Sequence, residues 1–259
     1  MKIAPFQLPS NPEKTIYLRE ATVEDCEYFA ETDSDSEEMM TNEVMDLLQC
    51  EPDKYVDPRE WTADDRRLAA FWYFIATNED TTIHAPYNCP HCNEDHDPLV
   101  EMKDIGKEYK PITGRPYREI EHEGKKLRVI PRNGYLMTEL ESIRIQSDGS
   151  DTERRKNLAI MERHDIVGTL IEGTEPARDY RVAVIEKWVR SLSISSFKAL
   201  KEKRNNALSE MAHGLPTRLH EGKLFIMTTV HCENKLEDAG AKVRLRLPFW
   251  LGEMLPRLL

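Results

Sequence analysis

The stretch YNCPHCNEDHDP, residues 87–98, places Cys89, Cys92, His91 and His96 within ten positions. Thiolate sulfur and imidazole nitrogen are good ligands for Zn²⁺, and a Cys-x-x-Cys turn lets two sulfurs reach one ion. Pro90 lies inside this turn and stiffens it. The stretch therefore predicts one half of a zinc site, and the other half must come from elsewhere in the chain.

The best source of a second half is Cys232, which is preceded by His231. It lies at the end of a predicted strand over residues 223–232 and before a predicted turn, just as the first pair of cysteines falls at the tip of a predicted hairpin. Cys26 and Cys50 fall in predicted helices and are interpreted as small buried hydrophobic residues. Two hairpin tips that face each other across one ion would form a zinc ribbon.

The second tip lacks the full ribbon pattern, because positions 229 and 235 are Thr and Lys rather than Cys. Three thiolates are then available, and the fourth ligand is a histidine or water. The histidines near the two tips are His231, His96, His91 and His84. His96 lies four residues after Cys92, whereas His231 could bind beside Cys232 only if the backbone kinks. Neither of these two is preferred, so the predicted ligand set is Cys89, Cys92, Cys232, His231 and His96.

Such a site is predicted to be structural. Cysteine-rich zinc sites are usually closed, whereas a catalytic metal needs an open coordination position and an acid or base directed at a substrate. The sequence contains no phosphate-binding loop, nucleophile elbow or dinucleotide fingerprint. We therefore expect a protein that is not an enzyme and has no small-molecule substrate. The alternatives are a ribbon that has lost its metal and keeps free cysteines, or a metal-dependent hydrolase.

Helix and strand signals alternate along the whole chain. Capping boxes at Thr22–Asp25 and Thr62–Asp65 predict two helix starts, and further helices are predicted from residue 134 to Gly214, including one that ends at Gly173. Hairpins are predicted over residues 80–104 and 117–131. The fold class is therefore α+β, with helical segments around small antiparallel β hairpins and a zinc-ribbon-like element.

These signals divide the chain into four predicted segments. They are an N-terminal strand and helical segment (1–79), a β-hairpin module with the Cys-x-x-Cys turn (80–132), a helical insertion (133–221), and a C-terminal β hairpin with an apolar tail that completes the ribbon (222–259).

Composition limits the classes of partner. The chain has 259 residues and a net charge of −11, which argues against a protein that coats duplex DNA or an anionic membrane. It has no apolar run long enough to span a bilayer, and its N-terminus does not resemble a secretory signal. Five scattered cysteines indicate reduced thiols in a cytoplasmic setting.

The last twelve residues, PFWLGEMLPRLL, form an apolar segment that we expect to be exposed. Exposed apolar surface tends to indicate a partner. The predicted partner-binding residues are Phe249, Trp250, Leu251, Met254 and Leu255. Two basic runs, residues 201–204 and 242–246, are interpreted as the outward faces of a helix and a strand, so nucleic-acid binding is not favoured.

The order of the segments resembles that of the T4-type phage baseplate hub assembly family. The resemblance runs through four stretches: LPSNPEKTIYLREATVEDCEYF (8–29), WTADDRRLAAFWYFIATNEDTTIHAPYNCPHC (61–92), WVRSLSISSFKALKEKRNNALSEMAHGLPTRLHEGKLF (188–225) and VHCENKLEDAGAKVRLRLPFWLG (230–252). No single stretch is specific, and the order of all four is what supports the resemblance.

The resemblance implies a non-enzymatic protein that acts in baseplate hub assembly or is built into the tail baseplate. Its partners would be other phage tail or baseplate proteins, and it would be found in the host cytoplasm during assembly and in the virion tail. It also implies that Cys89, Cys92 and Cys232 are knuckle positions. The alternative function is a zinc-ribbon regulator that binds nucleic acid or a host polymerase.

Overall fold

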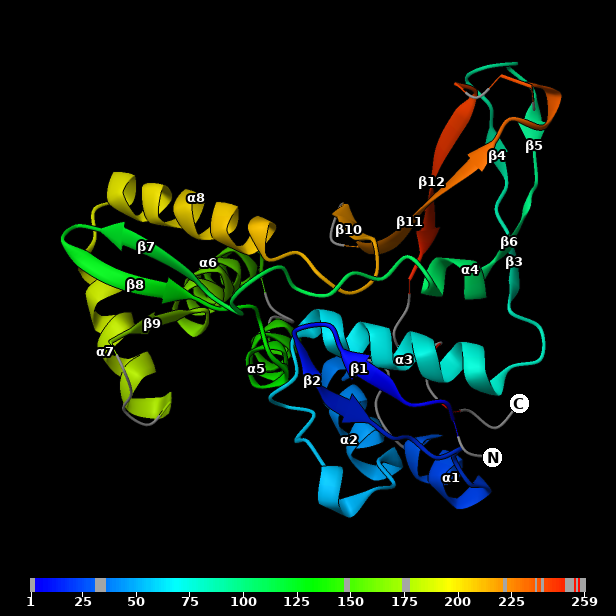
Figure 1. Ribbon diagram of the computed structural model, residues 1–259. Helices are drawn as coiled ribbons and strands as arrows, with labels where there is room; N and C mark the ends of the chain where they lie inside the picture. The colour runs from blue at the N-terminus through cyan, green and yellow to red at the C-terminus, as the bar shows by residue number, and fades with distance from the viewer. Residues whose placement is uncertain are drawn as a thin grey trace.

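The computed structural model of the chain describes residues 3–30, 36–146, 150–173, 178–220, 223–235, 237–238, 240–249, 254 and 256. Helices and small antiparallel sheets alternate along these residues, so the predicted α+β class is confirmed. Figure 1 shows two lobes joined near α5 and an arm of strands that rises from one of them.

The first lobe contains the N-terminal third of the chain. Its elements are β1 (Phe6–Leu8), β2 (Asn11–Ile16), α1 (Val23–Ala30), α2 (Glu37–Leu48), the short 3₁₀ helix η1 (Pro52–Lys54) and α3 (Ala63–Thr77). Helix α3 begins at the predicted capping box, in which Thr62 and Asp65 each accept a hydrogen bond from the other residue's backbone N–H. Its residues Leu68 and Phe71 are fully buried and form the centre of the lobe's core.

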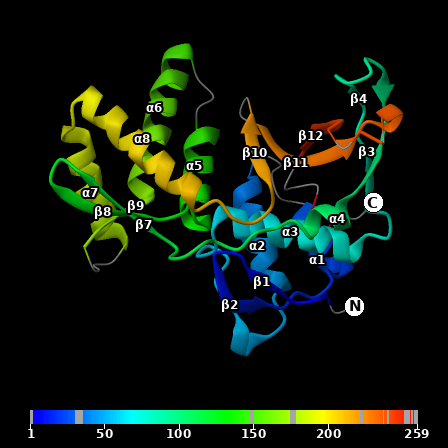
Figure 2. The same cartoon turned by 45° about the horizontal axis from the view of Figure 1, so that its top comes forward.

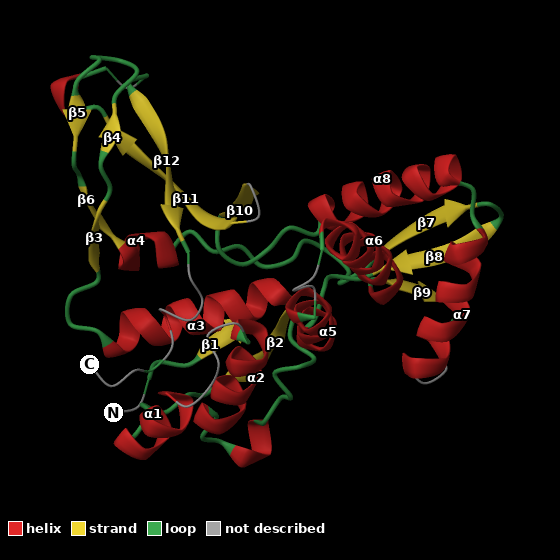
Figure 3. Ribbon diagram, turned by 180° about the vertical axis from the view of Figure 1, so that it is seen from behind, coloured by secondary structure: helices red, strands yellow, loops and turns green. Residues whose placement is uncertain are grey.

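The arm combines strands from two distant parts of the chain. The first part contains β3 (Thr82–His84), β4 (Tyr87–Asn88), β5 (Asp95–His96) and β6 (Leu99–Glu101), followed by α4 (Met102–Gly106). The second part contains β10 (Thr217–His220), β11 (Lys223–His231), the 3₁₀ helix η2 (Glu233–Lys235) and β12 (Lys242–Pro248). Strands β3–β6, β4–β5 and β10–β11–β12 form three small antiparallel sheets, and the two parts lie side by side at the end of the arm (Figures 1 and 3).

The second lobe packs a three-stranded sheet against helices. The strands are β7 (Arg118–His122), β8 (Lys125–Val129) and β9 (Leu170–Glu172), and the helices are α5 (Gly134–Ile145), α6 (Asp151–Gly168), α7 (Arg178–Ser191) and α8 (Ile194–Glu210). The β7–β8 hairpin turns at Glu123 and Gly124, which both have positive φ, as a tight two-residue turn requires. Figure 2 shows α6 extending beyond the rest of this lobe.

The two hairpins assigned to one module over residues 80–132 belong to different parts of the molecule. The first contributes Val100 to the core of the first lobe, whereas Leu127 and Val129 of the second hairpin are buried with Ile166 and Leu200. The segment boundary at residue 132 is therefore incorrect as a structural boundary. The reason is β9, which pairs with β8 and draws the second hairpin into the core of the second lobe.

The helix predicted to end at Gly173 ends at Gly168 instead. Residues 170–172 form β9, where Leu170 pairs with Val129 and is buried. A Cβ at Gly168 would lie 2.5 Å from Leu136, so this glycine allows α5 and α6 to pack closely. Tertiary pairing thus overrides the helical pattern of the last residues.

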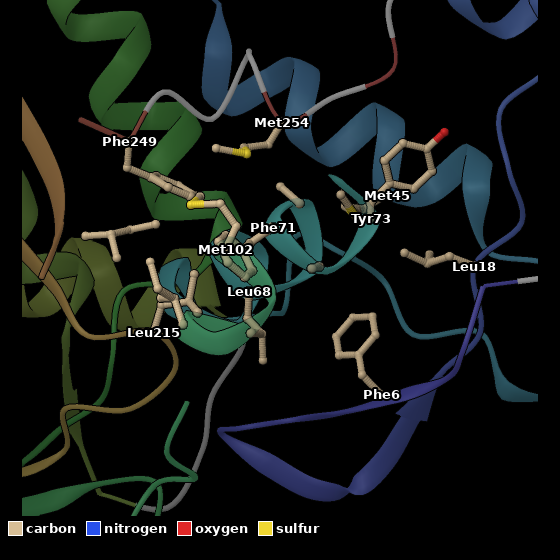
Figure 4. Packing of buried hydrophobic residues seen from close by; sticks show 14 of the residues in the cluster. Phe6, Leu18, Met45, Leu68, Phe71, Tyr73, Met102, Leu215, Phe249 and Met254 are labelled. Carbon is tan, nitrogen blue, oxygen red and sulfur yellow. The ribbon is translucent and has the colours of Figure 1, made fainter. Parts of the chain in front are cut away.

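The prediction of an exposed apolar tail is wrong for the two predicted contact residues that the structure describes. Phe249 is 3% exposed and Met254 is 8% exposed, and both belong to the core of the first lobe. Figure 4 shows them with Phe71, Met102 and Leu215 in one cluster. Their burial leaves them little surface for a partner, and it is favourable because it removes two large apolar side chains from water. Trp250, Leu251 and Leu255 lie outside the described residues.

Polar contacts within the second lobe and between the lobes complete the fold. Asp165 on α6 accepts hydrogen bonds from Arg132, 2.5 and 2.8 Å long, and is 2.8 Å from a guanidinium nitrogen of Arg204 on α8. His213, which follows α8, is buried and lies 2.7 Å from the hydroxyl of Thr62, the N-cap of α3.

Among the described residues, no helix combines the length and apolar character that crossing a bilayer requires.

Candidate metal centre

The first tip is a tight turn that directs its side chains inward. The backbone N–H of Asn93 donates to the carbonyl of Cys89 (2.8 Å), and the N–H of Cys89 donates to the carbonyl of Glu94 (2.9 Å). Asn93 has a φ of 58°, a left-handed conformation that asparagine tolerates better than most residues. The turn buries Cys89 completely and leaves Cys92 half-buried.

The second tip places one cysteine opposite the first pair. Strand β11 ends at His231, and the N–H of Cys232 donates to the carbonyl of Ala241 (2.9 Å), which closes the turn toward β12. Cys232 and Ala241 are both fully buried, and they pack with Cys89 in a small cluster that Tyr87 and Val243 partly cover. The cysteines of the two tips therefore meet inside a protected site.

Four potential ligand atoms from Cys89, Cys92, His96 and Cys232 all lie within 4.8 Å of one another. The Sγ of Cys92 is 3.1 Å from Nε2 of His96 and 3.6 Å from Sγ of Cys232, and the last sulfur is 4.0 Å from that same nitrogen. Around a tetrahedral zinc ion, ligand atoms would be separated by about 3.5–3.8 Å, given usual bond lengths. The donor set and its spacing therefore fit one tetrahedral metal ion.

Of the two histidines ranked equally, the structure brings only His96 to the cysteines. In β5 the side chains alternate, so Asp95 is exposed and His96 is 7% exposed and faces the cluster. His231 is exposed and pairs with Lys242 across the sheet. Because neighbouring residues of an extended strand face opposite sides, His231 cannot share the side of Cys232. Its place among the predicted ligands is thus corrected.

The other two candidate histidines also make contacts outside the cluster. Nδ1 of His84 lies 3.0 Å from a carboxylate oxygen of Asp97, and both side chains are exposed. Nε2 of His91 lies 3.3 Å from the carbonyl oxygen of Lys242 and helps to join the first tip to β12.

The thiols differ in how readily they ionise. Burial opposes ionisation of Cys89, but hydrogen bonds from the backbone N–H groups of His91 and Cys92, and from the Cys232 and Cys92 thiols, lower the pKa of Cys89 to about 6. Burial, and then the hydrogen bonds to Cys89 and Cys92, raise the pKa of Cys232 to about 11. One thiolate therefore forms easily, and further thiolates at this spacing require a cation to balance their charge.

His96 is held by groups on both of its ring nitrogens. Its Nε2 faces the Cys92 sulfur, which is the main cause of the raised pKa of His96. Its Nδ1 lies 3.5 Å from Oε2 of Glu233, in η2 of the second tip. The His96 ring also packs beside that of Tyr87, its partner across β4 and β5, with ring centroids 5.5 Å apart.

Asn234 adds a second contact between the tips. Its side-chain amide donates to Oε2 of Glu94 (2.6 Å) and lies 3.8 Å from Sγ of Cys92. The sequence does not mark Glu233 or Asn234 as part of the site. Their proximity to a predicted ligand, Cys232, is the one signal that could have found them, and it does not indicate which way their side chains point.

The arrangement can hold a metal ion, around which three sulfurs and one nitrogen would form a tetrahedral set. Comparison of the chain with protein-family models, with curated proteins and with solved structures finds no match.

Proposed function

We propose that Cys89, Cys92, His96 and Cys232 bind one structural Zn²⁺ ion and complete a zinc ribbon between the two tips. The observation that supports this most strongly is the convergence of three thiols and one imidazole, from positions up to 143 residues apart (232 − 89), in a largely buried site. Sulfur and imidazole donors favour zinc over magnesium or calcium, which prefer oxygen. The ion would hold the hairpin of β4 and β5 against the hairpin of β11 and β12.

Metal analysis tests this proposal directly. Protein purified without a metal-binding tag should contain one zinc ion per chain, and chelation should release it with loss of ordered structure in the arm. Hydrogen exchange at residues 87–96 and 226–245 would then rise, while exchange in α6 and α8 would change little. Purified protein without zinc that also fails to take up added zinc would contradict the proposal.

We further propose that the chain is a non-enzymatic protein of the contractile phage tail, acting in baseplate hub assembly or as a baseplate component. The order of the four stretches that resemble this family supports the assignment, and a closed site without a position for water is consistent with a role in binding. Its partners would be other tail or baseplate proteins in the host cytoplasm.

Mass spectrometry of tail-assembly intermediates and of finished particles tests the assignment. We expect peptides from this chain in the intermediates, in the particles, or in both. Absence from both, in a phage that expresses the chain, would contradict a role in the tail.

A nucleic-acid-binding regulator is the second candidate, and the exposed face of β12 favours it. Lys242, Arg244 and Arg246 lie on this face, and none of them forms an ion pair with an acidic residue in the described part of the chain. The residues opposite them on β11 are His231, Thr229 and Met227, so no carboxylate faces the three cations from that strand.

Fluorescence anisotropy with a labelled single-stranded RNA and a DNA duplex would test this candidate. If the protein is such a regulator, its binding to nucleic acid should weaken as salt rises from 50 to 200 mM. The variant Arg244→Glu/Arg246→Glu should lose this binding. An unchanged anisotropy at low salt would exclude it. We rank this candidate below the assembly role, because a net charge of −11 disfavours binding to the phosphate backbone of nucleic acids.

A further inference from the structure

The two tips contribute unequally to the candidate metal centre. The first tip supplies Cys89, Cys92 and His96, whereas the second supplies only Cys232. In a full ribbon each tip supplies two ligands, so each tip is fixed by two bonds to the metal. A tip that is bound through one sulfur alone could rotate about that bond, so other contacts must fix its orientation.

Glu233 follows Cys232 directly and reaches the ligand of the opposite tip. Its carboxylate lies 3.5 Å from Nδ1 of His96, whose Nε2 faces the sulfurs. A metal-bound histidine usually donates its second ring N–H to a carboxylate or carbonyl, which fixes the ring's orientation and the nitrogen that carries the proton. Glu233 is therefore placed to hold His96 with Nε2 free for a metal.

Asn234 reaches the first tip at a different point. Its side-chain amide donates to Glu94 and lies near the Cys92 sulfur, while its backbone N–H is directed at the Cys232 sulfur. One residue thus contacts both tips. Amide N–H groups near thiolates balance part of the negative charge that three sulfurs and one Zn²⁺ leave on the site.

We propose that Glu233 and Asn234 are positioning residues of this metal site and that they replace the ligand missing from the second tip. In this arrangement Cys232 binds the metal, Glu233 contacts the ligand His96, and Asn234 contacts the ligand Cys92. The inference rests on the proposed zinc site and adds the residues that hold its two halves in register.

Zinc affinities of matched variants test the proposal. Glu233→Gln and Asn234→Asp keep the size of each side chain but remove the charge of one and the donors of the other. We expect each to weaken Zn²⁺ binding about tenfold or more, measured by competition with a chromophoric chelator. Glu237→Gln is the control, because Glu237 is exposed in the same loop and is not part of the cluster.

A second measurement separates positioning from a general loss of structure. In the zinc-bound protein, ¹⁵N-edited NMR of His96 should show the proton on Nδ1, and Glu233→Gln should shift that proton and nitrogen while Glu237→Gln should not. Zinc affinities of both variants within twofold of wild type would overturn the proposal and leave the zinc site standing. A wild-type chain that binds no zinc would overturn both.

Discussion

His96 and His231 show how one position along a strand separates a candidate ligand from a surface residue. Both lie within a few residues of a cluster cysteine, and the sequence ranks them equally. Strand geometry separates them, because His96 faces the cluster from β5 whereas His231 faces solvent beside Cys232. The meeting of the three cysteines could thus be predicted from the sequence. Which histidine faces them depends on the register of its strand, and register is not apparent from the sequence.

The two histidines form a matched pair for mutation. His96→Ala should lower the affinity for Co²⁺ at least 100-fold and change the absorption spectrum of the bound ion, because one of four ligands is lost. His231→Ala should leave both unchanged. Absorption titration with Co²⁺ checks this, and equal effects of the two substitutions would contradict the assignment of His96.

At the scale of elements, Phe249 and Met254 near the end of the chain are part of the core of the first lobe. The backbone N–H of Phe249 donates to the carbonyl of Leu224 (3.0 Å), so the pairing of β12 with β11 continues into the first lobe. An apolar segment at a chain end has the same composition whether it binds a partner or its own core. The sequence alone could not distinguish these cases.

Phe249→Ala should destabilise the protein by about 3 kcal/mol, because it removes a buried aromatic side chain and leaves a cavity. Deletion of residues 248–259 should be more damaging still and should yield poorly soluble protein. Urea unfolding followed by circular dichroism checks the substitution. Ile194→Ala, at a side chain that is 78% exposed, is the control and should change stability by less than about 0.5 kcal/mol.

Element boundaries were predicted best where the signal is local. The capping boxes at Thr22–Asp25 and Thr62–Asp65 form as predicted, because their hydrogen bonds join residues three positions apart. The sequence does not indicate β9, because its pairing partner, β8, lies about 40 residues earlier in the chain. For the same reason, the sequence does not indicate that the hairpin of β7 and β8 packs in the second lobe.

At the scale of the whole molecule, Asp165 joins α6 both to α8 and to the chain segment between β8 and α5. Burial raises its pKa, but hydrogen bonds and charge from Arg132, and the charge of Arg204, outweigh this and hold the pKa below its usual range. Arg204 is itself almost fully buried, so loss of the carboxylate would leave a buried cation without a counter-charge.

Asp165→Asn should therefore destabilise the protein by about 3 kcal/mol at pH 7. Since the folded-state pKa is lowered, this stability is present above the unfolded-state pKa, about 3.9, and is lost as the pH falls through the folded-state value. The difference in urea midpoint between wild type and variant should then shrink below about pH 4. A difference that stays constant down to pH 3 would contradict the ion-pair account.

X-ray absorption at the zinc edge of the purified protein would determine the ligands of the bound ion. We expect one tetrahedral zinc ion with three sulfur ligands at about 2.3 Å and one nitrogen ligand at about 2.0 Å. A zinc ion bound mainly by oxygen, or a fourth ligand that is water, would contradict a closed structural site formed by Cys89, Cys92, His96 and Cys232.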